Sequence, residues 1–327
     1  MKMVLLYHSV FQKATILWIF GHIADFFVTY ADFLFLSDAP FCESEKAAFS
    51  VVVFVDKSGF IVDNYFIDKQ TETEIKMGKF DGYLICTDLD GTFTNGHDIC
   101  GENAKYVKYF QDNGGLFTVS TGRLPGHFSD FEGFRPNCPV ITHNGAVIYD
   151  FEKDEILYKR ALPNNCTELC DFAFGNEKIS RLHMCEMYEV SVCKTLSDVR
   201  RDAEYFKAVF CIDDEQETII FRDKLKERFG DRYCIFLGWS TGIEALAKDI
   251  NKGTAVKKLR EILGDKVKKM ICVGDSESDS FMMREADIGY AVENADKAAK
   301  AAADRVTVHY EKGAIAQIIR DIENELP

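Results

Sequence analysis

The chain has 327 residues, which is enough for about two domains of ~150 residues each. Apolar residues make up 47% and charged residues 28%, which excludes intrinsic disorder, and only 6 prolines exclude a collagen-like or proline-rich chain. The 39 Lys and Arg against 53 Asp and Glu give a formal net charge of −14, which argues against nucleic acid and anionic membranes as partners. A phosphorylated substrate would also be repelled, so phosphate chemistry in this chain should require a metal cation.

The cysteines point to a reducing compartment. There are 11 of them, an odd number, and they form no CxxC pair. Cys166 and Cys170 lie one helical turn apart, but this spacing alone is weak evidence for a metal site. Buried, reduced thiols in a cytoplasmic protein are the better interpretation.

The first segment, residues 1 to about 70, is richer in aromatic residues and poorer in charge than the rest of the chain. Its most apolar window, 14–36, is long enough to span a bilayer. However, His22, Asp25 and Asp32 interrupt the window, and no basic cluster flanks it. We therefore expect no membrane anchor, and the absence of a small-residue cleavage site argues against a secretory signal.

Two further features bear on this segment. The apolar run at 51–55 is consistent with a buried strand. Met77 opens a short polar lead into the next apolar strand, as the start of a cytosolic domain often does. We therefore expect translation to start at Met77 and residues 1–76 to be an extension outside the natural protein.

After Met77 the pattern becomes that of an α/β protein. Apolar runs at 83–86, 116–119 and 270–273 each stop at polar residues, as strands buried on both faces of a parallel sheet do. Apolar residues recur at helical spacing between and after these runs. The three helical faces are Ala104, Val107 and Phe110; Val256, Leu259 and Leu263, ending at Gly264; and Ile315, Ile318, Ile319 and Ile322.

The first group of chemically informative residues follows the strand at 83–86 and reads Asp88-Leu-Asp90-Gly91-Thr92. Two carboxylates one residue apart repel each other, and a divalent cation such as Mg²⁺ relieves that repulsion with hard oxygen ligands. Gly91 allows a sharp turn away from the strand. On its own, Asp-Gly is also an ordinary turn.

The second group follows the strand at 116–119 and reads Ser120-Thr121-Gly122-Arg123. A hydroxyl followed by a glycine amide can hold two phosphoryl oxygens where backbone N–H groups point outward. A helix N-cap accounts equally well for Ser or Thr at such a position.

Two more groups follow in the second half of the chain. Lys252-Gly253 precedes the helix at Val256, although most lysines are solvated surface charges. Gly274-Asp275-Ser-Glu-Ser-Asp279 places two carboxylates four residues apart after the strand at 270–273. In open α/β sheets the ligand lies beyond the carboxyl ends of the strands, which is where Asp88, Thr121 and Asp275 fall.

The four groups in this order make the chain similar to the haloacid dehalogenase-like (HAD) phosphohydrolase superfamily, in particular to its Cof-type branch (class IIB). The resemblance covers about Phe80 to the C-terminus and includes 143–146 (His-Asn-Gly-Ala) and 286–292. One departure is Ser278, where the branch usually has Asn. The resemblance implies an α/β fold, a Rossmann-like parallel-sheet core at 77–161 and 245–327 with an inserted α/β (C2-type) cap domain at 162–244.

The resemblance also implies a mechanism, a Mg²⁺-dependent phosphatase that acts through an aspartyl-phosphate on a small phosphorylated metabolite, with sugar phosphates as the leading class. The implied catalytic residues are Asp88 as nucleophile, Asp90 as acid and base, Thr121 and Lys252. The implied phosphate- and substrate-binding residues are Thr121, Gly122, Arg123, Asn144 and Lys252. The implied metal ligands are Asp88, the backbone carbonyl of Asp90 and Asp275, with Asp279 behind them. Read alone, Asn144-Gly145 indicates a hairpin turn.

Alternatives remain at this stage. One is a phosphomutase of the same fold. Another is a non-catalytic, membrane-tethered protein that binds phosphate and uses the apolar window 14–36 as its tether. A dehalogenase is disfavoured because it needs no acid two residues after the nucleophile. In the predicted cap, substrate specificity could involve Arg181, His183, Tyr188 or Trp239, although packing inside the cap is the expected state of each.

Overall fold

The computed structural model describes residues 2–8, 13–19, 50–56, 59–65, 78–128, 134–163 and 166–326. The chain divides into two compact units, Met1–Lys76 and Met77–Pro327. In the first unit, four strands form an antiparallel sheet in the order β2-β1-β3-β4. Their bounds are β1 Lys2–His8, β2 Lys13–Ile19, β3 Ser50–Asp56 and β4 Gly59–Tyr65.

The apolar window at 14–36 begins inside this sheet. Residues 14–19 belong to strand β2, and 20–36 lie outside the described residues. None of the helices in the described part of the chain is both long and apolar enough to cross a membrane. The strand expected at 51–55 is present within β3.

The second unit is built on a five-stranded parallel sheet in the order β17-β16-β15-β5-β6. The strands are β5 Tyr83–Thr87, β6 Leu116–Val119, β15 Lys269–Gly274, β16 Ile288–Ala291 and β17 Arg305–Val306. The helices are α1 Asn103–Asp112, α4 Lys252–Leu263, α5 Glu277–Glu285, α6 Lys297–Ala302 and α7 Ala314–Glu325. The expected strands and the three expected helices are all present.

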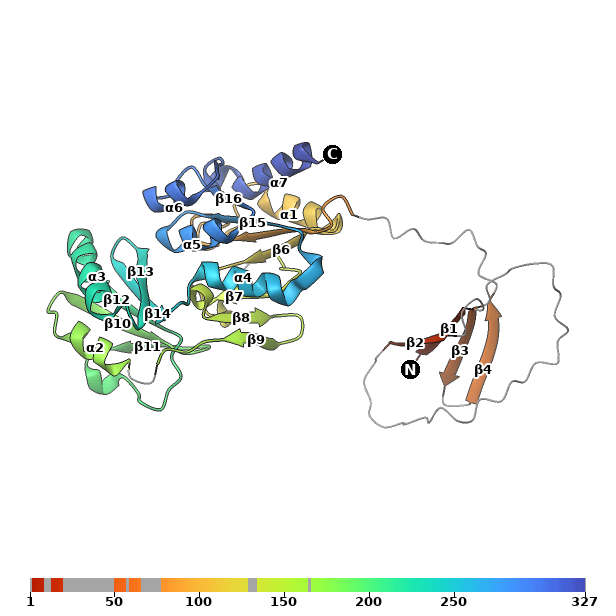
Figure 1. The fold of residues 1–327 in the computed structure, drawn as a ribbon, viewed down its shortest axis with the longest axis horizontal. Helices are drawn as coiled ribbons and strands as arrows, with labels where there is room; N and C mark the ends of the chain where they lie inside the picture. The colour runs from red at the N-terminus through yellow and green to blue at the C-terminus, as the bar shows by residue number, and fades with distance from the viewer. Residues whose placement is uncertain are drawn as a thin grey trace. The chain divides into compact units, whose positions relative to one another are not determined.

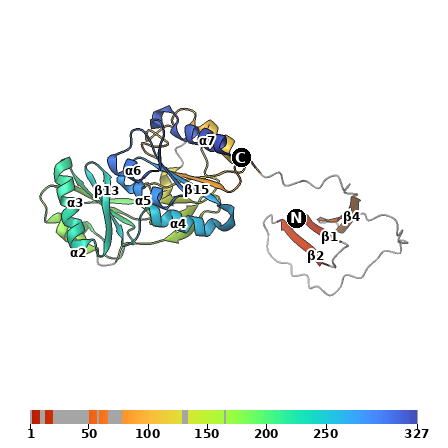
Figure 2. The ribbon, with the colours of Figure 1, turned by 45° about the horizontal axis from the view of Figure 1, so that its top comes forward.

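Both faces of the central strands are buried. Ile85 of β5 packs into the cluster that contains α1 and α7, whereas its neighbours Leu84 and Cys86 pack into the cluster that contains α4. In both views α7 and α4 accordingly lie on opposite sides of β15 (Figures 1 and 2). This two-sided burial explains why the strands read as continuous apolar runs.

A small antiparallel sheet follows β6 and carries the Asn144 turn. It consists of β7 Val140–Thr142, β8 Val147–Asp150 and β9 Glu155–Lys159. The β7–β8 hairpin turns through a 3-10 segment at His143–Gly145, where Asn144 takes the left-handed conformation (φ 53°). The interpretation of Asn144-Gly145 as a hairpin turn is confirmed.

The stretch predicted to form a cap holds a second α/β layer. Its antiparallel sheet has the order β11-β10-β12-β14-β13. The elements are α2 Thr167–Phe174, β10 Ile179–Cys185, β11 Val190–Cys193, β12 Lys207–Ile212, α3 Glu215–Phe229, β13 Tyr233–Trp239 and β14 Gly242–Ala247. A short 3-10 turn lies in this layer at Leu196–Asp198, and others lie in the core at Pro125–Phe128, Gly264–Lys266 and Tyr310–Lys312.

The two faces of this cap sheet differ. Leu182, Phe210 and Ile243 pack against α2 and α3 in one apolar cluster. Because side chains alternate along a strand, the residues between them, including Glu244, project from the opposite face. The predicted end of the cap at Glu244 falls inside β14, which continues to Ala247.

Candidate active site

Three carboxylates meet beyond the carboxyl ends of two neighbouring strands. Asp88 follows β5, and Asp275 follows β15, which pairs with β5 in parallel; Asp279 lies in the first turn of α5. One oxygen from each of the three lies within 4.8 Å of the others. Asp88 and Asp279 are buried, and Asp275 is partly buried.

Lys252 lies between two of these carboxylates. Its Nζ donates to Asp88 Oδ1 and to Asp279 Oδ1, both at 2.6 Å, and its side chain is only 2% exposed. Lys252 is the first residue of α4, and Asn251 caps that helix by accepting hydrogen bonds from the N–H groups of Gly253 and Thr254. The N-cap residue Asn251 therefore fixes the position of the helix end from which the Lys252 side chain extends into the cluster.

The electrostatics of the cluster leave an excess of negative charge. Burial raises the pKa of Asp88 well above its usual range, with Lys252 opposing and the other two carboxylates reinforcing the shift. Burial, followed by repulsion from Asp279, raises the pKa of Asp275 to about 7. Burial alone would lower the pKa of Lys252, but Asp279 and Asp88 outweigh it and raise this pKa above its ordinary value. Three carboxylates face one ammonium, an arrangement that a divalent cation would neutralise.

Asp279 has its hydrogen-bonding capacity almost filled by the protein. Its Oδ2 accepts from the backbone N–H of Asp275 at 3.1 Å and from the N–H and hydroxyl of Ser276 at 3.0 and 2.8 Å. A Cβ on Gly274 would lie 2.3 Å from the Cβ of Asp279, so only glycine fits at the end of β15. Ser278, the departure from the family pattern, is buried and its hydroxyl bonds that of Ser276.

Asp90 does not join this cluster. Its carboxylate is 48% exposed and forms a bidentate pair with Arg123, at 2.8 Å from Nε to Oδ2 and 2.6 Å from Nη2 to Oδ1. The intervening Gly91 turns the chain with φ 82°, and a Cβ there would lie 2.8 Å from Asp275 Oδ2. Thr92 then donates to Asp275 Oδ1 at 3.1 Å. Of the two carboxylates in the Asp-Leu-Asp group, only the first therefore points into the site.

The turn after β6 lies next to the Asn144 hairpin. Thr121 is buried, its carbonyl accepts from the N–H of Asn144 at 2.9 Å, and its Oγ1 accepts from the N–H of Arg123 at 3.1 Å. Within the described residues, the Gly122 N–H has no protein acceptor. A Cβ on Gly122 would lie 3.1 Å from the Asn144 side chain. The predicted phosphate-binding residues Thr121, Gly122 and Asn144 are thus brought together.

Two charged residues that the sequence analysis did not single out lie against this turn. Lys207, the first residue of β12, donates from Nζ to the carbonyl of Gly122 at 2.9 Å and to Glu244 Oε1 at 3.1 Å. Glu244 Oε2 accepts from Asn144 Nδ2 at 2.5 Å. Both charges are almost fully buried. The sequence signal that could have found these two residues is one charged residue in each of the otherwise apolar segments 207–212 and 242–247.

The predicted cap candidates are not packed inside. Tyr188 is 56% exposed, Trp239 is 46% exposed and Arg181 is exposed, so the expectation that each lies packed in the cap is wrong for these three. Trp239 lies at the end of β13, where its ring covers Gly242 and its Nε1 donates to Thr241 Oγ1. His183 is half-buried and Arg181 exposed on β10.

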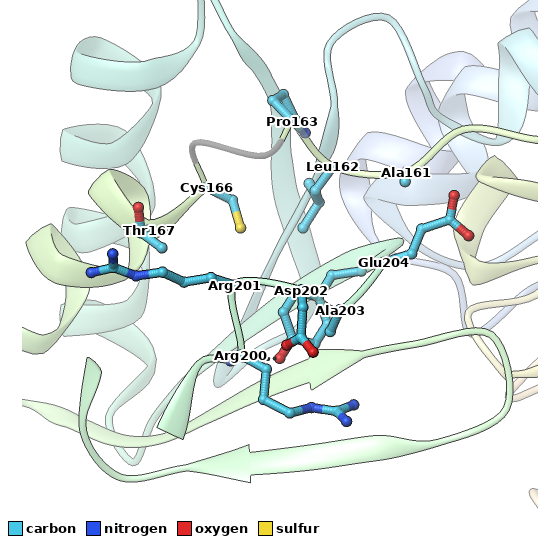
Figure 3. Close-up of a pocket in the computed structure, with 11 residues that line it drawn as sticks. Ala161, Leu162, Pro163, Cys166, Thr167, Arg200, Arg201, Asp202, Ala203 and Glu204 are labelled. Atoms are coloured by element: carbon cyan, nitrogen blue, oxygen red, sulfur yellow. Dashed lines mark hydrogen bonds between the residues drawn. The ribbon is translucent and has the colours of Figure 1, made fainter. Parts of the chain in front are cut away.

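A cavity of about 410 Å³ lies elsewhere in this layer (Figure 3). It is formed by the segments 161–163 and 200–205 and the start of α2, and the first two segments are joined by a hydrogen bond from the N–H of Leu162 to the carbonyl of Tyr205 at 2.7 Å. None of the predicted site residues lines this cavity. The cavity is therefore separate from the carboxylate cluster.

A family model described as haloacid dehalogenase-like hydrolase matches residues 85–188 and 176–319. The chain belongs to this family. A relative from Bacillus subtilis, 5-amino-6-(5-phospho-D-ribitylamino)uracil phosphatase YcsE, is 29% identical over 244 residues, which cover 72% of this chain and 94% of that protein. Another B. subtilis relative, phosphatase YwpJ, is 26% identical over 288 residues, covering 73% of this chain and 99% of that protein.

Solved structures of HAD proteins share the fold. A HAD subclass IIB sugar phosphatase superposes with a TM-score of 0.63 at 19% identity, over 73% of this chain and 98% of that one. A haloacid dehalogenase-like hydrolase from B. subtilis gives a TM-score of 0.64 at 20% identity, over 72% and 98%. The predicted fold class, a parallel-sheet HAD core with a cap, is confirmed. With its family and its phosphatase relatives, the chain is a phosphoric monoester hydrolase.

Proposed function

We propose that this HAD phosphatase hydrolyses a small phosphorylated metabolite through a Mg²⁺-dependent aspartyl-phosphate mechanism. The observation that carries the proposal is the convergence of Asp88, Asp275 and Asp279 around Lys252. Asp88 and Asp275 follow neighbouring strands, whereas Asp279 and Lys252 lie in the first turns of α5 and α4. So much buried negative charge is costly unless a cation or a proton compensates it.

The donor set fits magnesium. The side chains of Asp88 and Asp275 and the backbone carbonyl of Asp90 would supply hard oxygen ligands. Burial, with repulsion from neighbouring carboxylates, raises the pKa of both aspartates, and a bound cation would oppose that shift. When bound, the ion would neutralise charge on the phosphoryl oxygens and orient the phosphate for in-line displacement. Asp279 would stabilise the loop and Lys252 from behind the ligands.

In the first half-reaction, a carboxylate oxygen of Asp88 attacks phosphorus while the bond from phosphorus to the ester oxygen breaks. For this step the Asp90 carboxyl has to leave its pair with Arg123 and, carrying a proton, give that proton to the ester oxygen, so the alcohol leaves neutral. In the second, a water molecule attacks the phosphorylated Asp88, and Asp90 takes the proton from the water. Phosphate departs, and the Asp88 carboxylate is restored.

The remaining residues stabilise charge and position. Lys252, the Thr121 hydroxyl and the Gly122 amide would face the phosphoryl oxygens, and such electrostatic positioning is most of phosphoryl-transfer catalysis. Arg123, which binds the Asp90 carboxylate through two hydrogen bonds in this structure, would bind the phosphate once Asp90 turns to the leaving oxygen. Asn144 would bind the substrate next to Thr121.

The proposed substrate class rests on the relatives and on a structural neighbour. Two B. subtilis relatives are named as phosphatases of 5-amino-6-(5-phospho-D-ribitylamino)uracil, and a solved neighbour is called a sugar phosphatase. We therefore favour a phosphate ester of a sugar or sugar alcohol. We assign residues 77–161 and 245–327 to the catalytic core and 162–244 to the cap that covers it.

The nucleophile is tested with Asp88→Asn and p-nitrophenyl phosphate in Mg²⁺. We expect turnover to fall by at least about a thousandfold, because a covalent mechanism has no substitute for its nucleophile. Asp112→Asn, a change at an exposed carboxylate on α1, is the matched control and should leave the rate unchanged. EDTA should abolish the wild-type rate and Mg²⁺ restore it.

Three outcomes would contradict the proposal. Near wild-type turnover by Asp88→Asn would show that Asp88 is not the nucleophile, and activity insensitive to EDTA would show that the reaction needs no metal. If hexose 1-phosphate gave the 6-phosphate in place of free phosphate, the enzyme would be a phosphomutase.

A further inference from the structure

The turn that carries Thr121 and Gly122 is held from two directions. From the core, the N–H groups of His143 and Asn144 donate to the carbonyls of Arg123 and Thr121. The carbonyl between them, that of Gly122, accepts from Lys207 Nζ at 2.9 Å. The core thus supplies two of the three donors, and the first residue of β12 in the cap layer supplies the third.

This third contact bears on the Thr121 hydroxyl. The carbonyl of Gly122 and the N–H of Arg123 belong to one peptide group and point in opposite directions. Lys207 binds one end of that group, and the other end donates to Thr121 Oγ1 at 3.1 Å. Since Oγ1 accepts that bond, its own hydrogen is free to donate elsewhere.

The charge on Lys207 strengthens the chain of hydrogen bonds. A charged donor polarises the peptide group, and bonds in series inside a protein reinforce one another. Glu244 Oε1 lies 3.1 Å from the same Nζ, and both side chains are almost fully buried. Glu244 in turn accepts from Asn144 Nδ2, so the same pair reaches both sides of the turn.

We propose that Lys207 is a positioning residue of the reaction, which acts from the cap through the Gly122–Arg123 peptide to orient the Thr121 hydroxyl toward the phosphate. This inference rests on the proposed function. It makes the geometry of the phosphate-binding turn depend on whether the cap sheet is in place, because removing β12 from the core removes the donor to Gly122.

The test uses Lys207→Met combined with Glu244→Gln, because the single Lys207 change would leave the buried Glu244 carboxylate without its cationic partner. In the full chain, with Mg²⁺ and p-nitrophenyl phosphate, we expect kcat/KM to fall on the order of 100-fold, as misplacement of a catalytic group does. The inhibition constant of inorganic phosphate should rise with it. Lys248→Met, at an exposed lysine just after β14, is the control and should change neither. Thermal melting verifies that each variant is folded.

A mutant cycle with Thr121→Val separates positioning from general loosening of the fold. If Lys207 acts through Thr121, adding the Lys207 and Glu244 changes to Thr121→Val should cost no more than about threefold further. The proposal would be overturned if the fold-losses in kcat/KM of Thr121→Val and of the Lys207/Glu244 variant multiplied in the combined variant. It would also be overturned if the folded Lys207/Glu244 variant kept wild-type kcat/KM and phosphate inhibition. If instead Asp88→Asn stays active while phosphate inhibition still depends on Lys207, only the covalent mechanism fails.

Discussion

Protonation of Asp275 should make both the stability of the metal-free protein and its affinity for Mg²⁺ depend on pH. Burial and Asp279 raise its pKa to about 7 from an ordinary 3.8, so the folded protein without metal holds a proton there that the unfolded chain has lost. Stability without metal should therefore fall as pH rises from 3.8 to about 7, because the folded state binds more protons across that window.

The same proton should compete with magnesium. We expect the affinity for Mg²⁺ to weaken as pH falls below about 7, since the ion must displace the proton from Asp275. Calorimetric titration with Mg²⁺ at pH 6 and pH 8, in buffers of different ionisation enthalpy, measures both affinity and proton release. Asp275→Asn should melt higher than wild type in EDTA at pH 8 and lose the stabilisation by Mg²⁺. Equal affinities at the two pH values, with no proton released, would contradict this account.

Asp90 permits a second prediction at the same scale. If its carboxyl protonates the leaving oxygen, Asp90→Asn should lower kcat/KM for an alkyl phosphate on the order of 100-fold. The loss for p-nitrophenyl phosphate should be much smaller, because nitrophenolate leaves without a proton. Comparing kcat/KM confines the measurement to the first half-reaction. Equal losses for the two esters would assign Asp90 to binding instead of proton transfer.

At the scale of elements, the N-terminus of α4 joins stability to chemistry. Asn251 caps the helix and Lys252 follows it directly. We expect Asn251→Ala to lower the free energy of unfolding by about 1 kcal/mol and, by loosening the first turn, to reduce kcat as well. Asp214→Ala is the matched control. Asp214 is the N-cap residue of α3, a helix of the cap domain, and accepts a hydrogen bond from the Glu217 N–H. It should cost similar stability without the loss of kcat; similar losses of kcat in both would contradict the coupling.

How far the sequence predicts an element depends on how local its determinants are. The strands β5, β6 and β15 and the helices α1, α4 and α7 follow from short-range apolar patterns, and their ends place Asp88, Thr121 and Asp275 correctly at one edge of the sheet. The pairing of Lys207 with Glu244 does not follow from such local patterns, because it depends on the order of the strands in the cap sheet. Likewise, nothing local to Asp90 shows that its carboxylate turns outward to Arg123.

At the scale of the whole molecule, the chemistry is confined to one of two compact units. Every residue of the candidate site lies between Asp88 and Asp279, within Met77–Pro327. We expect the segment 77–327, produced alone, to fold and to match the full chain in kcat/KM and in thermal midpoint, because it contains its own core and the entire site. Loss of activity or aggregation of this segment would show that residues 1–76 contribute to the enzyme.

The position of the site within the sheet has a consequence for unfolding. β5 and β15 are adjacent inner strands, each flanked by a partner on both sides. Amide hydrogens in such strands exchange with solvent only when the whole domain opens, whereas edges and loops open far more readily. In a denaturant titration, catalytic activity should therefore persist while edges and loops fray. It should be lost together with the cooperative unfolding of the domain.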